Sequence, residues 1–249
     1  MRLRIALGAA IKFVAGKVTV TGLEKINKVA VNRNLVIATT HLTDEDLPIS
    51  SAVLSQHLDL ALTDMSPNHQ WPNPLKLLLM AAGESNFIPI DFNLNPTTKS
   101  TTGIFNPKNF IPMIRTINDG KRLVIAAHNP SNAREFPCRP GVAVPYVSAF
   151  ANADILPVAV TYEKQDKRIG MANHMGFTVL ARSGVNVSIG DPIRPIVPPI
   201  IDELKLESSF CDWRHKISTD EFRIIKTFLK QQGELVVDEL KNLTYGTVS

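Results

Sequence analysis

The sequence predicts an α/β fold in which a mostly parallel central sheet is flanked by helices. Three observations carry this prediction. Short apolar runs alternate along the chain with longer segments of helical pattern, which is typical of a parallel sheet covered on both faces. The length of 249 residues is enough to bury a substantial core in one large domain or two small ones. Polar segments directly follow two of the predicted strands, where the active residues of such folds gather.

Apolar runs bounded by turn residues predict the strands. The clearest run covers residues 34–40, which Asn32 and Asn34 bound on one side and His41 on the other. The full set of predicted strands is 17–21, 34–40, 59–63, 86–91, 122–127, 154–162 and 186–189.

Longer segments with helical punctuation predict the helices. Residues 218–221 read Ser-Thr-Asp-Glu, a capping-box pattern that predicts the start of a long terminal helix, and Gly233 is expected to weaken its middle. Gly83 and Gly120 stand where two other helices are expected to close. The predicted helices are 47–58, 75–82, 107–118, 141–152 and 218–242.

These elements suggest three parts. Residues 1–16 predict a basic, amphipathic N-terminal helix, which either packs on the domain or lies in a membrane interface. Residues 17–195 form the α/β domain. Residues 196–249 hold a proline-rich crossing and the C-terminal helix, which is expected to pack on the domain. No apolar stretch reaches the roughly 20 residues that span a bilayer.

Composition narrows the classes of function. A net charge of +4 and a pI near 9.1 favour an anionic membrane surface or anionic substrates, and an ordinary basic soluble protein is the alternative. Aromatic residues make up only 6% of the chain, which does not suggest a base-stacking nucleic-acid binder. The two cysteines, Cys138 and Cys211, lack a C-x-x-C spacing and suit a reducing cytoplasm, although one disulfide is left open.

The most informative motif is His41-x-x-x-x-Asp46, directly after the predicted strand 34–40. A carboxylate that orients an imidazole fixes its tautomer and stabilises the imidazolium, so the pair suits general-base catalysis. On a strand-to-helix turn this spacing can bring the two side chains together. The alternative is a solvated His41, with Thr43, Asp44 or Asp46 capping the next helix.

A metal site is another interpretation of the same segment, because His41 and the carboxylates at 44–46 include zinc and magnesium ligands. The other histidines show no i, i+4 pairing, so we expect no metal. Gly-rich phosphate loops are also absent from the sequence.

Six short blocks follow one another in a set order along residues 15–195. They are VTVTG at 18–22, HLTDED at 41–46, FIPIDF at 87–92, LVIAAHNPS at 123–131, ILPVAV at 155–160 and IGDPI at 189–193. In this order the chain resembles the glycerolipid acyltransferase family, which includes the 1-acylglycerol-3-phosphate acyltransferases. The ordered series is a stronger signal than any single block.

The resemblance implies a mechanism and partners. His41 would take the proton of an acceptor hydroxyl, and Asp46 would orient the imidazole. The hydroxyl would attack the thioester of an acyl-CoA or an acylated carrier protein, which serves as co-substrate, without any further cofactor. No covalent enzyme intermediate is required, and the G-x-S-x-G pattern of a nucleophile elbow is absent.

Two blocks depart from the family pattern. Phe92 replaces an arginine, and His128-Asn129 replaces Glu-Gly, at positions that engage the phosphate and glycerol of the acceptor in the family. Phenylalanine cannot grip a phosphate as a guanidinium does. Either Arg134 or Arg139 substitutes, or the acceptor lacks a phosphomonoester. The substrate-binding residues implied by position are His128, Asn129, Ser131, Arg134 and Pro157, and a structural Asn-Pro turn is an equal alternative for Asn129 and Ser131.

The expected function is acyl transfer to a lysophospholipid or related glycerolipid alcohol by a cytoplasmic protein bound peripherally to the membrane. The N-terminal helix and the apolar segment 75–80 are the expected membrane contacts, and no nucleic-acid partner is expected. The alternative is a lipid-binding or regulatory protein that has kept the fold and lost the chemistry. The altered blocks favour this alternative, whereas the intact His41 and Asp46 oppose it.

Overall fold

The fold was obtained as a computed structural model, which describes residues 17–29, 33–41, 46–58, 60–65, 87–90, 110–128, 140–163, 184–206 and 217–246. The strands are β1 (Val18–Thr21), β2 (Asn34–Thr39), β3 (Leu60–Met65), β4 (Phe87–Ile90), β5 (Arg122–Ala126), β6 (Ala153–Tyr162) and β7 (Val185–Ile189). The helices are the 3-10 helix η1 (Leu23–Lys28) and the α-helices α2 (Asp46–Leu54), α4 (Ile111–Asn118), α5 (Ala143–Phe150), α7 (Pro199–Leu206) and α8 (Thr219–Tyr245).

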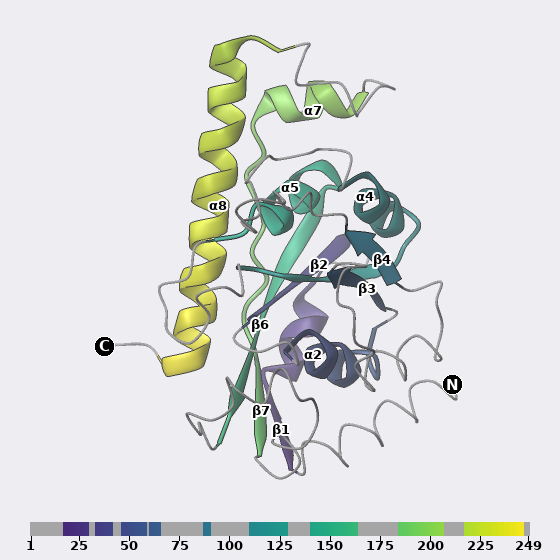
Figure 1. Cartoon of the computed structure of the whole chain (residues 1–249), viewed down its shortest axis with the longest axis vertical. Coiled ribbons are helices and arrows are strands. Elements are labelled where there is room, and N and C mark those ends of the chain that lie inside the picture. Colours follow the sequence, from purple (N-terminus) through teal and green to yellow (C-terminus); the bar gives the residue numbers. More distant parts are fainter. Residues whose placement is uncertain are drawn as a thin grey trace, which may run out of the picture.

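All described strands belong to one seven-stranded sheet with the order β1-β7-β6-β2-β5-β3-β4. Five neighbouring strands, from β6 to β4, run parallel to one another. β7 pairs antiparallel with β6, and the edge strand β1 pairs parallel with β7, so β1 and β7 run in the opposite direction to the other five strands. β2 therefore lies inside the parallel part of the sheet, between β6 and β5 (Figure 1).

Helices cover both faces of the sheet, as Figure 1 shows, and alternate residues of each central strand point to opposite faces. On one face, Leu35 and Ile37 of β2 pack with side chains of α2 and with the partly buried apolar residues of η1. On the other face, Val36 and Ala38 pack with the core residues of α4, α5, α7 and α8. Because both faces are buried, residues 35–38 of β2 form an uninterrupted apolar run rather than an alternating one.

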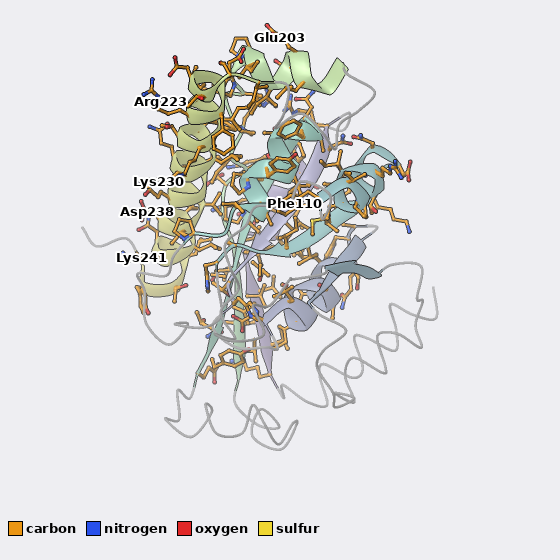
Figure 2. The ribbon with its side chains drawn as sticks, turned by 45° about the horizontal axis from the view of Figure 1, so that its top comes forward. Phe110, Glu203, Arg223, Lys230, Asp238 and Lys241 are labelled. Atoms are coloured by element: carbon orange, nitrogen blue, oxygen red, sulfur yellow. The ribbon has the colours of Figure 1, made fainter. Side chains whose placement is uncertain are left out.

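Three aromatic rings lie together in the second of these cores. The Tyr146 ring lies 4.8 Å from the ring of Phe110 and 4.4 Å from that of Phe150, measured between centroids. Figure 2 shows Phe110 on the inner side of the structure. It also shows Arg223, Lys230, Asp238 and Lys241 along the outer side of α8. The long helix therefore presents an apolar stripe to the sheet and a charged face to solvent.

The start of α8 is the predicted capping box. The backbone N–H of Glu221 donates to the Ser218 hydroxyl, and the Glu221 carboxylate accepts from the backbone N–H of Ser218 at 2.6 Å. The hydrogen bond from the Ser218 side chain, followed by that from its backbone, lowers the pKa of Glu221. The stabilisation by this carboxylate is therefore present above its ordinary pKa of 4.5 and is lost as the pH falls through the lowered value.

Gly233 has a packing role in α8 that the sequence did not reveal. A Cβ at this position would lie 3.0 Å from Cβ of Pro140 and 3.4 Å from the carbonyl oxygen of Gly141. The absence of a side chain thus lets the helix approach the segment that leads into α5. Glycine has a low helix propensity, and the close packing of α8 at Gly233 offsets this cost.

The segment after β1 is tied to the end of β7 by surface charges. The Asp191 carboxylate lies 2.6 Å from Nζ of Lys28 and 3.2 Å from Nζ of Lys25, both in η1. The hydrogen bond from Lys28, followed by that from Lys25, lowers the pKa of Asp191, and the same pairing raises the pKa of Lys28. Exposed ion pairs of this kind contribute little to the free energy of folding, so we expect them to affect the orientation of η1 more than its stability.

The α/β fold with a mostly parallel sheet flanked by helices is confirmed, and each predicted strand has a counterpart within a few residues of its expected bounds. The reversed direction of β7 and β1, the helix α7 and the 3-10 helix η1 were not predicted. The predicted helix 75–82 and the N-terminal helix 1–16 lie outside the described residues. Among the helices in the described part of the chain, none is long and apolar enough to cross a membrane.

Candidate active site

The candidate site lies where three neighbouring parallel strands reach their carboxyl ends. β2 is followed by His41, β5 is followed by His128, and β6 ends at Tyr162. Because β2 lies between β5 and β6, His41 has one of these residues on each side in the order of the strands. This edge is the expected place for active residues in an open α/β sheet.

Main-chain hydrogen bonds fix the last residues of β2 to both neighbours. The carbonyl of Thr39 accepts from the N–H of Ala127 at 2.9 Å, and the N–H of Thr40 donates to the carbonyl of Val158 at 3.1 Å. The Thr40 hydroxyl also accepts from the N–H of Val160 at 3.0 Å. The backbone that carries His41 is therefore held from two sides, which limits the positions that its imidazole can take.

His128 contacts the main chain of His41. The N–H of His41 donates to Nε2 of His128 at 3.0 Å, and both residues are buried. A ring nitrogen that accepts a hydrogen bond carries no proton, so this geometry assigns a neutral His128 ring protonated on Nδ1. His128 thus supports the backbone at His41 with the nitrogen that faces it.

Asp46 is the first residue of α2, and it is fully buried. Its Oδ1 accepts a hydrogen bond of 2.8 Å from the hydroxyl of Tyr162. The N-terminus of a helix favours a negative charge through its free N–H groups and its dipole. The helix start and the tyrosine hydroxyl both stabilise the ionised carboxylate at this buried position.

Burial excludes one interpretation of the motif. His41 exposes 4% of its surface and Asp46 exposes none, so neither is a solvated loop residue. A buried imidazole and a buried carboxylate need polar partners, because burial without them is costly. The chemistry available to such a pair is proton transfer at the carboxyl edge of the sheet.

The other predicted site residues fall into two groups. Pro157 lies within β6, level with Ala38 of β2, and its carbonyl accepts a hydrogen bond from the N–H of Gly190 at 2.8 Å. Its position is three residues before Val160, so it belongs to the body of the strand rather than to its end. Asn129, Ser131 and Arg134 lie outside the described residues, as do Phe92 and Arg139, and their predicted roles stay predictions.

Tyr162 is the site residue that the sequence did not single out. It is 116 residues from Asp46 along the chain, so no local pattern links the two. The available signal was its place as the last residue of a predicted strand, because a tyrosine there offers a hydroxyl at the functional edge. Within the described ranges, no group of three His, Cys, Asp or Glu side chains is placed to hold a metal ion.

The contact between His128 and His41 leads to a stability prediction. Replacing His128 by alanine should lower the free energy of unfolding by about 2 kcal/mol, because the buried N–H of His41 would lose its acceptor. His128→Gln should retain most of the stability, since the amide oxygen can reach the position of Nε2. Chemical denaturation of the wild type and both variants measures the free energy of unfolding. An equal loss of stability in the two variants would contradict the role of His128 as the acceptor for the N–H of His41.

Comparisons with known proteins bear on the fold. No protein-family model matches the chain, and no curated protein matches it. Among solved structures, the chain is similar to the crystal structure of the 1-acyl-sn-glycerophosphate (LPA) acyltransferase PlsC from Thermotoga maritima, with a TM-score of 0.50 and 15% sequence identity. The alignment covers 96% of this chain and 78% of that chain. The two proteins therefore share a fold at low sequence identity.

Proposed function

We propose that the protein is an O-acyltransferase that moves a fatty acyl group from an acyl thioester to the hydroxyl of a lysophospholipid or a related glycerolipid alcohol. The observation that carries this proposal is the burial of both His41 and Asp46 at the carboxyl end of the parallel sheet. The similarity in fold to an LPA acyltransferase supports it. The ordered blocks along residues 15–195 support it independently of the fold.

In the proposed reaction, His41 acts as the general base and Asp46 orients it. The imidazole accepts the proton of the acceptor hydroxyl as the oxygen attacks the thioester carbonyl. The tetrahedral intermediate then collapses, the new ester forms and the carbon–sulfur bond breaks. The imidazolium returns its proton to the leaving thiolate, so the products are an ester and a free thiol. Asp46 stabilises the imidazolium during this cycle.

The identity of the acceptor is a separate part of the proposal. Nε2 of His128 is engaged by the main chain of His41, at a block where the family pattern has a carboxylate. A phosphate on the acceptor would then need another partner, and Arg134 or Arg139 is the proposed one. An acceptor without a phosphomonoester is the alternative. Peripheral attachment to the membrane through residues 1–16 and 75–80 also belongs to the proposal, and an absence of liposome binding would contradict it.

A lipid-binding or regulatory protein without catalysis is the second candidate. The engagement of His128 by the backbone favours this candidate, because it leaves that nitrogen unavailable to an acceptor. The two candidates differ in one outcome, which is acylation of a hydroxyl that depends on His41.

The test is the release of free thiol from a panel of acyl-CoAs and from acylated carrier protein, in the presence of a mixed lysolipid and alcohol extract. Release that requires the acceptor would support acyl transfer, and mass spectrometry of the product would identify the acceptor. No release from any donor, with the protein folded and bound to vesicles, would favour the non-catalytic candidate.

A further inference from the structure

The hydrogen bond between Tyr162 and Asp46 joins two distant parts of the sequence at the candidate site. Tyr162 ends β6, the ten-residue strand beside β2, and its hydroxyl lies 2.8 Å from Oδ1 of Asp46. Val158 and Val160 occupy the same apolar cluster as Tyr162, on the face of the sheet that α2 covers. The alternation of side chains along β6 thus directs the phenol toward the start of α2.

The position of β6 is itself fixed next to His41. The N–H of Val160 donates to the Thr40 hydroxyl, which extends the contact between β6 and β2 beyond the regular pairing that ends at Thr39 and Val158. Tyr162 is two residues further along. One strand-to-strand contact therefore sets the backbone of His41 and the donor to Asp46 at the same time.

We propose that Tyr162 is a positioning residue that keeps the Asp46 carboxylate ionised and oriented toward its role with His41. This inference rests on the proposed acyl transfer. A buried carboxylate requires hydrogen-bond donors to remain charged, and the tyrosine hydroxyl supplies one at 2.8 Å. The start of α2 supplies a favourable dipole. In the described part of the chain, the titratable groups at the carboxyl ends of these three strands are His41 after β2, His128 after β5 and Tyr162 on β6, and Tyr162 donates to the Asp46 carboxylate.

A purely structural role for Tyr162 is the alternative. The residue is 9% exposed and its side chain packs in an apolar cluster, where a phenylalanine ring would fill the same volume. Only the hydroxyl distinguishes the two roles. Tyr162→Phe removes the donor and keeps the ring, so the fold is expected to survive the substitution.

The expected change in protonation has one sign. Without the donor, the Asp46 carboxylate is less stabilised relative to its protonated form, so it takes up a proton at higher pH. A hydrogen bond to a charged group corresponds to a shift of about one pH unit in the midpoint of that protonation. Because the ionised carboxylate is the form proposed to orient His41, the acid limb of the pH–rate profile should move to higher pH.

The first arm of the experiment needs no substrate. The protein is labelled with carbon-13 at the tyrosine Cζ and observed by NMR. The chain contains three tyrosines, so replacing each in turn by Phe assigns its resonance. The Tyr162 resonance should show an acid inflection that disappears in Asp46→Asn. The Asp46 carboxyl, observed with carbon-13 at the aspartate Cγ and assigned with Asp46→Asn, should take up its proton at higher pH in Tyr162→Phe. Tyr146→Phe, which changes a buried tyrosine in the opposite core, should leave that midpoint unchanged.

The second arm measures acyl transfer. In Tyr162→Phe, kcat should fall about tenfold with the KM for the thioester unchanged, and the acid limb should move to higher pH, as the Asp46 midpoint does. A wild-type Asp46 midpoint and an unmoved pH–rate profile in Tyr162→Phe would overturn the proposal. If the wild type transfers no acyl group, the proposed function fails, and the first arm still decides whether Tyr162 controls the protonation of Asp46.

Discussion

Replacing His41 by alanine is expected to lower kcat of acyl transfer by about 10³-fold, because the acceptor hydroxyl would lose its general base. The contact between His41 and His128 runs through the main-chain N–H, so the substitution leaves it in place. The loss should therefore appear in the chemical step rather than in the fold. Thiol release from the best acyl thioester, at saturating acceptor, measures it.

Two further variants make this prediction specific. His41→Gln keeps most of the buried volume and should be as inactive as His41→Ala. This outcome would assign the loss of activity to the missing base rather than to a cavity left by the smaller side chain. His57→Ala changes an exposed histidine just after α2 and should leave the activity unchanged. Melting temperatures of all variants check that they are folded. A His41→Ala protein with more than a tenth of the wild-type kcat would contradict the role of the base.

The central strands and the long terminal helix were predictable because their signals are local. The run before His41 is apolar at every position from Leu35 to Ala38, as a strand buried on both faces requires. Ser218 and Glu221 encode the start of α8 within four residues, and the structure places both capping hydrogen bonds there. Such features depend on neighbours in the sequence and not on the rest of the fold.

The reversed edge of the sheet was not predictable in the same way. The alternation of apolar residues in β7 is the same whether the strand runs parallel or antiparallel to β6. Its direction is set by contacts between distant segments, such as the pairing of Val158 with Ile189. The helix α7 was missed because the proline-rich stretch before it predicted a crossing segment. Pro199 instead begins this helix, where proline is well tolerated.

The sequence links only those members of the candidate site that are close together along the chain. His41 and Asp46 share one short motif, so the sequence could link them. Tyr162 reaches Asp46 only because β6 lies next to β2 in the sheet. The order of strands in a sheet cannot be predicted from a single sequence. The main-chain role of His128 was also hidden, because a hydrogen bond to a backbone N–H leaves no pattern in the sequence.

Replacing Gly22 by alanine is expected to lower the free energy of unfolding by about 3 kcal/mol, which combines left-handed backbone strain with overpacking. Gly22 has φ near +77°, and a Cβ there would overlap the carbonyl oxygen of Ile189 at the end of β7. Backbone cannot move aside as a flexible side chain can. For a chain of this size the melting temperature should fall by about 6–12 °C.

Gly120 supplies the matched control, because it has φ near +89° and a Cβ added there would meet no atom within 4 Å. Gly120→Ala should therefore cost only the left-handed strain, about 1 kcal/mol. The difference in unfolding free energy between the two variants measures the effect of the close approach of Gly22 to β7. This approach lets β1 and η1 pack against β7. Equal destabilisation of the two proteins would mean that the approach is not needed and that this edge tolerates a displaced β1.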